Sequence, residues 1–258
     1  MNPFLQKLKA HQVSVGALVS FADATVSELM AGAGLDYIWI DMEHGPLSLA
    51  AVQAHVMAAQ LGGASAVVRV PGHDPVVIKQ VLELGADGIV VPMVNTADEA
   101  RQAVAACRYP PQGIRGYGPR RSGRYGRAAG EAYVRAANEQ VMVIAQIEHA
   151  EGVRNLDEIL QTPGLASIVV GPSDLSASLG VITQTTHPQV VQAIETVIAR
   201  AQRWAVPAGI FVGGPAAARE WLSKGMQWVC LGSDVSHLRQ AIDSAVAALK
   251  DSGTATTG

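Results

Sequence analysis

The sequence has few of the features that mark secreted or membrane proteins. It contains only two cysteines, Cys107 and Cys230, in unrelated contexts. No disulfide framework is indicated, and a reducing, cytoplasmic setting is expected. No apolar stretch approaches the roughly 20 uninterrupted residues that a membrane-spanning helix needs. Residues 1–7 also lack the apolar core of a signal peptide. We therefore expect no association with a membrane.

Charged residues are scarce as well. They make up 16% of the chain, and the net charge of −3 gives no global attraction to nucleic acid or anionic lipid. Apolar residues make up 49% of the 258 residues, which is enough for a large core. We expect residues 1–250 to form a single domain and the small, polar residues 251–258 to form a disordered tail.

Three signatures of particular chemistries are missing. A Schiff-base aldolase needs a desolvated lysine at a strand end, and none of the five lysines has such a position: Lys7, Lys9, Lys79, Lys224 and Lys250. The Gly-x-Ser-x-Gly elbow of serine hydrolases is absent. No glycine-rich nucleotide-binding loop follows the first predicted strand. Chemistry at a carbonyl group would therefore depend on a metal ion.

What the chain does contain is a regular alternation of short apolar runs and helical patterns. The helical spacing is clearest over 51–59, 76–84 and 188–198, and Pro75 and Gly85 suit the start and end of the second of these helices. The apolar runs do not alternate with polar residues, as expected for strands covered on both faces. Eight such runs predict a (β/α)8 TIM barrel, with a doubly wound open sheet as the alternative. The runs are 13–19, 36–41, 66–70, 88–92, 141–147, 166–171, 207–212 and 227–231.

The alternation is interrupted once, by a segment rich in arginine. Residues 108–127 carry six arginines and no helical pattern, and a long loop in a compact domain is usually functional or disordered. Placed after the fourth strand, it would lie on the catalytic face of a barrel. It would then be either a lid whose arginines meet an anionic substrate or a solvated loop against a neighbouring subunit. An RNA-binding role lacks support, because the rest of the chain supplies no basic surface.

Polar side chains follow several of the predicted strands directly. In a TIM barrel such residues meet at one rim, where active sites lie. Two carboxylates from adjacent strands, completed by water and substrate oxygens, suit Mg²⁺ or Mn²⁺. Without a metal ion, such neighbouring anions would repel each other. The residues gathered in this way are Asp41, Glu43, His44, Arg69, Gln146, Glu148 and Asp174.

These residues also suggest roles. Asp41 beside His44 makes an acid/base pair plausible, because a carboxylate holds the imidazole tautomer and raises its basicity. Arg69 could neutralise an enolate or a carboxylate. Each residue also has a plainer interpretation: Asp41 could cap the next helix, and Glu148 and Asp174 could pair with loop arginines.

Six motifs in one order, within a similarity that runs from about residue 13 to 249, resemble the HpcH/HpaI aldolase family. They are DMEHGP at 41–46, VRVP at 68–71, VPMVNTADEA at 91–100, RYPPQGIRG at 108–116, QIE at 146–148 and GPSDLS at 171–176. The branch they resemble most is that of the 4-hydroxy-2-oxoheptanedioate aldolases of aromatic catabolism.

The resemblance implies a class II pyruvate aldolase, which reversibly cleaves 4-hydroxy-2-oxo acids to pyruvate and an aldehyde. Glu148 and Asp174 would bind Mg²⁺, Mn²⁺ or Co²⁺. His44, supported by Asp41, would take the proton of the C4 hydroxyl, and Arg69 would stabilise the pyruvate enolate.

The same resemblance implies the substrate contacts and the assembly. Gln146 would border the pyruvate, N–H groups near Ser173 would hold its carboxylate, and Phe211 would contact the substrate. The family is commonly a homohexamer, a dimer of trimers. Glu83 stands where some members carry an aspartate that reaches a neighbour's site. Two other functions stay open: a lyase acting on a coenzyme A ester, and a binding barrel without catalysis.

Overall fold

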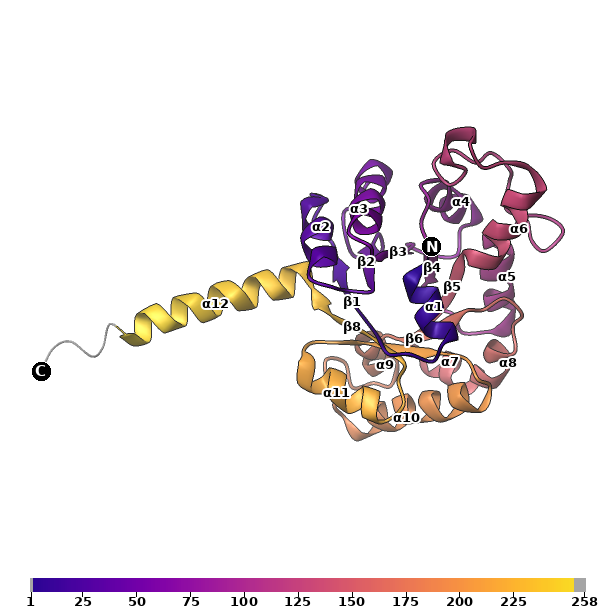
Figure 1. Ribbon diagram of the computed structural model, residues 1–258. Coiled ribbons are helices and arrows are strands. Elements are labelled where there is room, and N and C mark those ends of the chain that lie inside the picture. Colours follow the sequence, from indigo (N-terminus) through magenta and orange to yellow (C-terminus); the bar gives the residue numbers. More distant parts are fainter. Residues whose placement is uncertain (1, 253–258) are drawn as a thin grey trace, which may run out of the picture.

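The computed structural model describes residues 2–252, which fold into a closed barrel of eight parallel strands (Figure 1). Each strand pairs with the next along the chain, and β8 closes the barrel against β1. The predicted TIM-barrel architecture is therefore confirmed, and each strand lies within about two residues of its predicted range. The strands are β1 (Ser14–Val19), β2 (Tyr37–Asp41), β3 (Ser65–Arg69), β4 (Gly88–Val91), β5 (Met142–Ile147), β6 (Ser167–Val170), β7 (Ala208–Val212) and β8 (Trp228–Ser233).

Helices cover the outside of the barrel, and helical pieces occupy most of the connections. The predicted helices are present as α3, α4 and α10, and Asp74 caps α4 by accepting the Val76 N–H at 2.8 Å. Gly85 follows α4 with φ +83°, as a C′ glycine does. The helices are α1 (Pro3–Lys9), α2 (Thr25–Gly32), α3 (Leu49–Leu61), α4 (Pro75–Glu83), α5 (Ala97–Cys107), η1 (Arg124–Gly126), α6 (Gly130–Gln140), α7 (Ala150–Arg154), α8 (Leu156–Leu160), α9 (Pro172–Ser178), α10 (Pro188–Arg203), α11 (Pro215–Ser223) and α12 (Asp234–Ser252).

Large aromatic side chains fill the interior of the barrel. Phe4 of α1 stacks on Tyr37 with ring centroids 4.3 Å apart, and Trp228 meets both rings edge-on. Gly209 faces Trp228 so closely that any Cβ there would overlap the indole. The short helix α1 thus closes the N-terminal end of the barrel, and the opposite end is left for a site.

The arginine-rich segment does not lie where the sequence analysis placed it. It follows helix α5 and not strand β4, so it sits at the N-terminal end of the barrel, beside the last turn of α4. Glu83 accepts hydrogen bonds there from the Arg120 N–H at 3.1 Å and the Ser122 hydroxyl at 2.9 Å. The expectation of a lid over this subunit's own catalytic face was therefore wrong, because the chain crosses the barrel through α5 before the segment begins.

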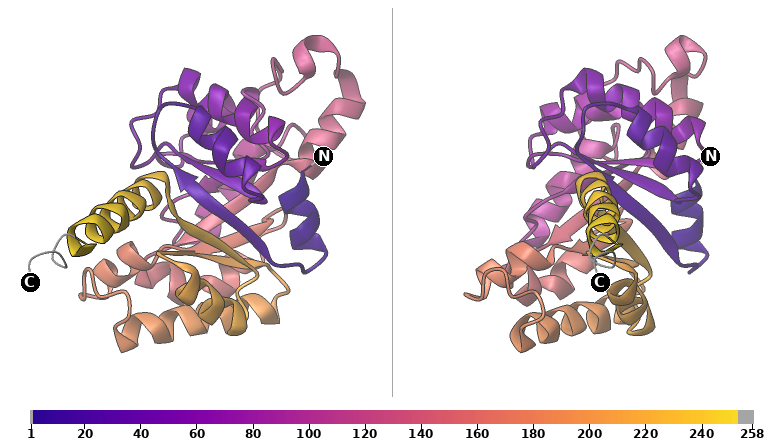
Figure 2. Two further views of the ribbon diagram at one scale, coloured as in Figure 1. Left: turned by 60° about the vertical axis from the view of Figure 1, so that its left-hand side comes forward. Right: turned by 90° about the vertical axis from the view of Figure 1, so that its left-hand side faces the viewer.

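Helix α12 leaves the barrel and projects away from it, as Figure 1 and the left view of Figure 2 show. Almost all of its side chains through Lys250 are exposed. Its last turn includes Asp251 and Ser252, the first two residues of the predicted tail. The rest of that tail, 253–258, lies outside the described residues.

Two predictions from composition can be compared with this fold. Cys107 and Cys230 are free and buried, and no disulfide joins them. Within residues 2–252, no helix is both long enough and apolar enough to cross a membrane.

Candidate active site

A cavity of about 310 Å³ opens at the C-terminal ends of the strands. Its lining comes from β1, β2, β3, β5, β6, β7 and β8, mostly at or just after their C-terminal ends, and from the start of α9. Of the residues that the sequence analysis gathered at this rim, Glu43 does not line the cavity and borders it through its contact with Arg69. The other predicted site residues all line it: Asp41, His44, Arg69, Gln146, Glu148, Ser173, Asp174 and Phe211.

Arg69 is held in one orientation by two carboxylates. Its Nε and Nη2 donate to the two oxygens of Asp41 at 2.9 and 2.8 Å, and its Nη1 lies 3.0 Å from Glu43 Oε2. The guanidinium also lies over the Trp39 ring, 5.5 Å from its centroid. Burial lowers the pKa of Arg69, but the hydrogen bonds and charge of Asp41 outweigh burial, and the net pKa is raised. Arg69 is thus a fixed cation in the cavity wall.

His44 has a different carboxylate neighbour from the one expected. Asp41 is occupied by Arg69, and its hydrogen bond to His44 comes from the backbone N–H, at 3.4 Å. The imidazole Nε2 instead lies 3.8 Å from Glu43 Oε2, and the His44 side chain is 65% exposed. The imidazole therefore stands at the mouth of the cavity, where it can exchange protons with solvent and reach a bound molecule.

Glu148 is the deepest carboxylate of the site. It is buried, its Oε1 accepts the Met93 N–H at 2.8 Å, and its Oε2 accepts from the Gln146 amide. Met93, whose N–H makes this bond, has φ +53°, a conformation that is uncommon for non-glycine residues. Burial raises the pKa of Glu148, and the charges of Glu43 and Asp174 raise it further.

The backbone at Gly171 packs directly against the Glu148 carboxylate. A Cβ at Gly171 would lie 2.5 Å from Glu148 Oε2 and 3.0 Å from Glu148 Cβ. Only glycine therefore lets the backbone that leads into α9 approach Glu148 so closely. The consequence is that the Glu148 carboxylate and the α9 segment that carries Asp174 are packed as one unit.

The cavity holds more negative charge than its arginine neutralises. Four carboxylates belong to it or border it, those of Asp41, Glu43, Glu148 and Asp174, against the single guanidinium of Arg69. Burial raises the pKa of Glu43 as well, and the nearby acids add to that rise. Such a charge excess is what a bound cation would relieve.

The donor atoms fit a hard divalent cation. Carboxylate oxygens are the ligands that Mg²⁺ and Mn²⁺ prefer, and Gln146 Oε1 is buried with no hydrogen-bond partner among the described residues. Over 2–252, however, no three His, Cys, Asp or Glu side chains converge as a ready-made ligand set. Glu148 and Asp174 would therefore hold the ion together with water and substrate oxygens.

The plainer interpretations of these acids find no support in the contacts. Within the described part of the chain, neither Glu148 nor Asp174 forms an ion pair, and the loop arginine Arg115 pairs with Glu83 instead. Asp41 does not cap α3, which Ser48 caps. No lysine lines the cavity.

Sequence reasoning missed Ser20 and Ser233, which line the cavity at the ends of β1 and β8. It also missed Trp39, which lies beneath Arg69. The two serines could have been found, because any polar residue directly after a barrel strand is a candidate for the site. Trp39 carries no such signal, since it reads as a core residue within a strand.

Comparisons with known proteins agree with this geometry. The model of the HpcH/HpaI aldolase/citrate lyase family matches residues 15–241. A 5-keto-4-deoxy-D-glucarate aldolase of Klebsiella pneumoniae is 36% identical over 249 residues, 96% of this chain and 97% of the relative.

Solved structures of the same family superpose closely. An HpcH/HpaI aldolase/citrate lyase family protein from Burkholderia cenocepacia has a TM-score of 0.93 at 34% identity, over 97% of this chain and 100% of the other. The citrate synthase SbnG has a TM-score of 0.88 at 29% identity, over 98% of this chain and 100% of the other. With its barrel, its cavity and these matches taken together, the chain belongs to the HpcH/HpaI aldolase/citrate lyase family.

Proposed function

We propose that this member of an aldolase/lyase family is a class II aldolase that reversibly cleaves 4-hydroxy-2-oxo acids to pyruvate and an aldehyde. The observation that carries the proposal is the excess of carboxylates around Glu148 and Asp174, beside the fixed cation Arg69 and the solvent-facing His44. A divalent cation held there, Mg²⁺, Mn²⁺ or Co²⁺, would polarise the 2-oxo group of the substrate as a Lewis acid.

The side chains of the chain account for the remaining tasks. His44, whose Nε2 lies 3.8 Å from Glu43 Oε2, would take the proton of the C4 hydroxyl as the C3–C4 bond breaks. The electron pair of that bond passes to the pyruvate unit as an enolate. Arg69, held by Asp41, would stabilise its negative charge.

The other lining residues would bind and orient the substrate. The unpartnered Oε1 of Gln146 lies in the wall beside Glu148 and offers a hydrogen-bond acceptor to substrate or water. N–H groups at Ser173 would hold the carboxylate of the 2-oxo acid, and Phe211 would provide an apolar contact from β7. These contacts would fix the 2-oxo acid end and leave the aldehyde end toward His44.

The substrate class follows from chemistry that two candidate substrates share. The name 5-keto-4-deoxy-D-glucarate places a keto group next to a carboxylate, then a CH₂ and then a carbon with a hydroxyl group. Read from the keto end, this is a 4-hydroxy-2-oxo acid, as 4-hydroxy-2-oxoheptanedioate is. Both compounds end in a second carboxylate. We therefore propose an acidic aldehyde product, from sugar-acid or from aromatic catabolism.

One alternative enzyme function is a lyase acting on a coenzyme A ester. The family description includes citrate lyase, but a nucleotide-phosphate groove would be needed next to the cavity. The only arginine-rich segment lies at the other end of the barrel, beside Glu83. We therefore favour the aldolase.

We also propose that the chain acts as a homo-oligomer, in keeping with the hexamer that the family resemblance implies. Helix α12 exposes an apolar stripe of Val235, Leu238, Ile242 and Val246. At its base lies an apolar hollow of about 440 Å³, lined by residues such as Leu29 of α2. The eighth helix of a TIM barrel normally covers this part of the sheet, so α12 of a second copy is the occupant we propose.

Disulfide trapping tests the exchange of α12. A Leu29→Cys chain mixed with an Ile242→Cys chain should form a disulfide between the two chains. A Leu61→Cys chain mixed with the same Ile242→Cys chain should not, although Leu61 is also an exposed leucine, on α3. Cross-linking only within a chain that carries both Leu29→Cys and Ile242→Cys would show instead that α12 folds back on its own barrel.

The proposed cytoplasmic location accords with the two free, buried cysteines.

The activity is tested by Asp174→Ala. We expect this variant to stay folded, since Asp174 makes no side-chain hydrogen bond or ion pair within 2–252, and to lose metal-dependent release of pyruvate. Circular dichroism would report the fold, and Mn²⁺ titration calorimetry the metal. Saturable binding of Mn²⁺ by the natural chain without turnover of any 4-hydroxy-2-oxo acid would favour a non-catalytic binding barrel.

A further inference from the structure

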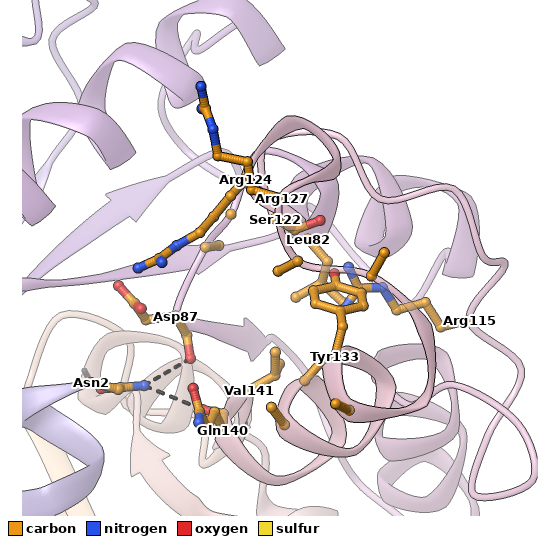
Figure 3. Close-up of a pocket in the computed structure, with 17 residues that line it drawn as sticks. Asn2, Leu82, Asp87, Arg115, Ser122, Arg124, Arg127, Tyr133, Gln140 and Val141 are labelled. Carbon is orange, nitrogen blue, oxygen red and sulfur yellow. Dashed lines mark hydrogen bonds between the residues drawn. The ribbon is translucent and has the colours of Figure 1, made fainter.

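A second hollow lies at the opposite end of the barrel from the catalytic cavity (Figure 3). Asp87 and Gln140, which come just before β4 and β5, form its floor, and the arginine-rich segment forms its wall. Its volume is about 580 Å³. It adjoins a hollow of about 650 Å³ with which it shares lining residues, among them Ser122, Arg124 and Arg127. We call the two together the basal groove. Its size suits a small metabolite.

The basal groove carries an excess of positive charge. Arg124 and Arg127 line both hollows, are exposed, and pair with no carboxylate anywhere in 2–252. Arg121 donates to two neutral acceptors, the Leu84 carbonyl at 2.9 Å and Gln60 Oε1 at 2.8 Å. Asp87 is the one carboxylate among the lining residues. A fourth lining arginine, Arg115, pairs with Glu83. The other three guanidiniums against one lining acid, on a chain of net charge −3, concentrate positive potential in the groove.

The arginines are presented by a segment that is fixed in place. Glu83 accepts from the Tyr109 hydroxyl at 3.4 Å and from Arg115 Nη2 at 2.9 Å, in addition to its bonds with residues 120 and 122. The buried Arg115 guanidinium also stacks over the Tyr109 ring at 4.4 Å. Because these contacts order the segment in advance, little conformational freedom would be lost when a ligand binds.

One further feature favours a ligand site over a plain charged surface. Arg115 lines the groove with a buried Nε that has no hydrogen-bond partner within the described residues.

We propose that the basal groove binds a small anion with two or more negative charges, either a phosphate group or a pair of carboxylates. Arginine forks match both kinds of group. The site would be separate from this subunit's own catalytic cavity, because it lies at the N-terminal ends of the strands while the reacting groups of the same chain lie at the C-terminal ends. Neither Arg124 nor Arg127 belongs to the machinery proposed above.

Calorimetric titration of the full chain tests this proposal, with inorganic phosphate in one series and succinate in the other. No divalent cation is added, so that neither anion enters the catalytic cavity as a metal complex. We expect saturable binding of at least one anion that weakens as ionic strength rises. Arg124→Gln and Arg127→Gln should each weaken it about tenfold or more. The control Arg101→Gln, which removes an exposed arginine of α5 paired with Asp98, should leave it unchanged.

The series that binds identifies the ligand: phosphate alone indicates a phosphorylated metabolite, and succinate alone a dicarboxylate. Two results would overturn the proposal. One is no binding of either anion at about 10 mM. The other is binding that survives in both groove variants, which would place the anion elsewhere, for example on Arg69. A change of assembly size in the variants without any anion binding would likewise refute it and identify the groove as a contact between copies of the chain.

Discussion

Replacing Gly171 with alanine should disable the site although no side chain of the proposed machinery is itself replaced. The new Cβ would lie 2.5 Å from Glu148 Oε2, 3.0 Å from Glu148 Cβ and 3.4 Å from Gln146 Nε2. An ordinary carbon–oxygen contact is about 3.3 Å, so the carboxylate would have to move by roughly 0.8 Å. Glu148 has little room to do so, because the Met93 N–H and the Gln146 amide hold its two oxygens.

The magnitude follows from what this movement breaks. Overpacking of this kind costs about 1–3 kcal/mol of stability. The movement would also lengthen the hydrogen bond from the Met93 N–H to Glu148, which is 2.8 Å long. Since a hydrogen bond to a charged group is worth about 1.5–3 kcal/mol, weakening it lowers the stability further. Misaligned ligands weaken metal binding by about 10- to 100-fold. Calorimetry with Mn²⁺ should show this loss, and pyruvate release should fall at least as far.

Gly213→Ala provides the matched control. Gly213 follows β7 at the same end of the barrel, and a Cβ there meets nothing within 4 Å. Its variant should bind Mn²⁺ and turn over like the natural chain. If Gly171→Ala also kept full Mn²⁺ affinity and turnover, the packing of Glu148 against Gly171 would be irrelevant to the site, and the reasoning would be refuted.

Four further predictions concern single groups. His44→Ala should slow cleavage by about 10²–10⁴-fold in steady-state kinetics while Mn²⁺ affinity is kept, and an equal loss of Mn²⁺ binding would make His44 a ligand instead. Arg69→Lys keeps the charge but loses the planar fork, so kcat should fall by about tenfold or more; a fully active variant would reduce Arg69 to a structural ion pair. Tyr37→Phe leaves the buried Val229 carbonyl without its 2.7 Å donor and should cost about 1–3 kcal/mol in urea unfolding, whereas an unchanged midpoint would contradict that value. Burial raises the pKa of Glu148, and the ion binds only its deprotonated form. When Mn²⁺ affinity is measured at decreasing pH, it should therefore start to fall at a higher pH than it would for an ordinary carboxylate. An affinity that stays unchanged until the pH reaches the usual glutamate pKa would argue against Glu148 as a ligand.

The sequence predicted the strands well because both of their faces are buried. The run 141–147 is apolar except for Gln146, and every residue of β5 is buried in the structure. The same logic located the site, since polar residues placed directly after such runs must meet at one rim. Glu148 and Asp174 were proposed in this way, and the motifs QIE and GPSDLS, which resemble the family, contain them.

Side-chain pairing could not be predicted in the same way. Asp41 lies three residues from His44, which suggested a pair, but Asp41 is aligned with Arg69 across the β2–β3 ladder and forms its hydrogen bonds there. Pairing across neighbouring strands depends on register and rotamer, which one sequence does not display. Ser20 and Ser233 were missed for a different reason: their positions at the ends of β1 and β8 mark them as candidates, but only the larger polar residues were considered in the sequence analysis.

The arginine-rich segment and α12 show the other limit. The segment 108–127 was recognised as unusual, but its position depends on whether α5 precedes it, and that helix was not identified. For α12, the apolar residues Leu238 and Ile242 indicate a helix with one buried face. Nothing in the sequence specifies whether its own barrel or another copy covers that face.

The most direct test of the central claim is pyruvate release from 4-hydroxy-2-oxoheptanedioate and 5-keto-4-deoxy-D-glucarate. Each is measured first with a chelator and then with Mg²⁺, Mn²⁺ or Co²⁺ restored. We predict no release with the chelator and recovery with at least one ion, with the ranking of the two substrates reporting the preferred aldehyde. Release that the chelator leaves unchanged, or no release from either substrate while Mn²⁺ is bound, would contradict a metal-dependent pyruvate aldolase.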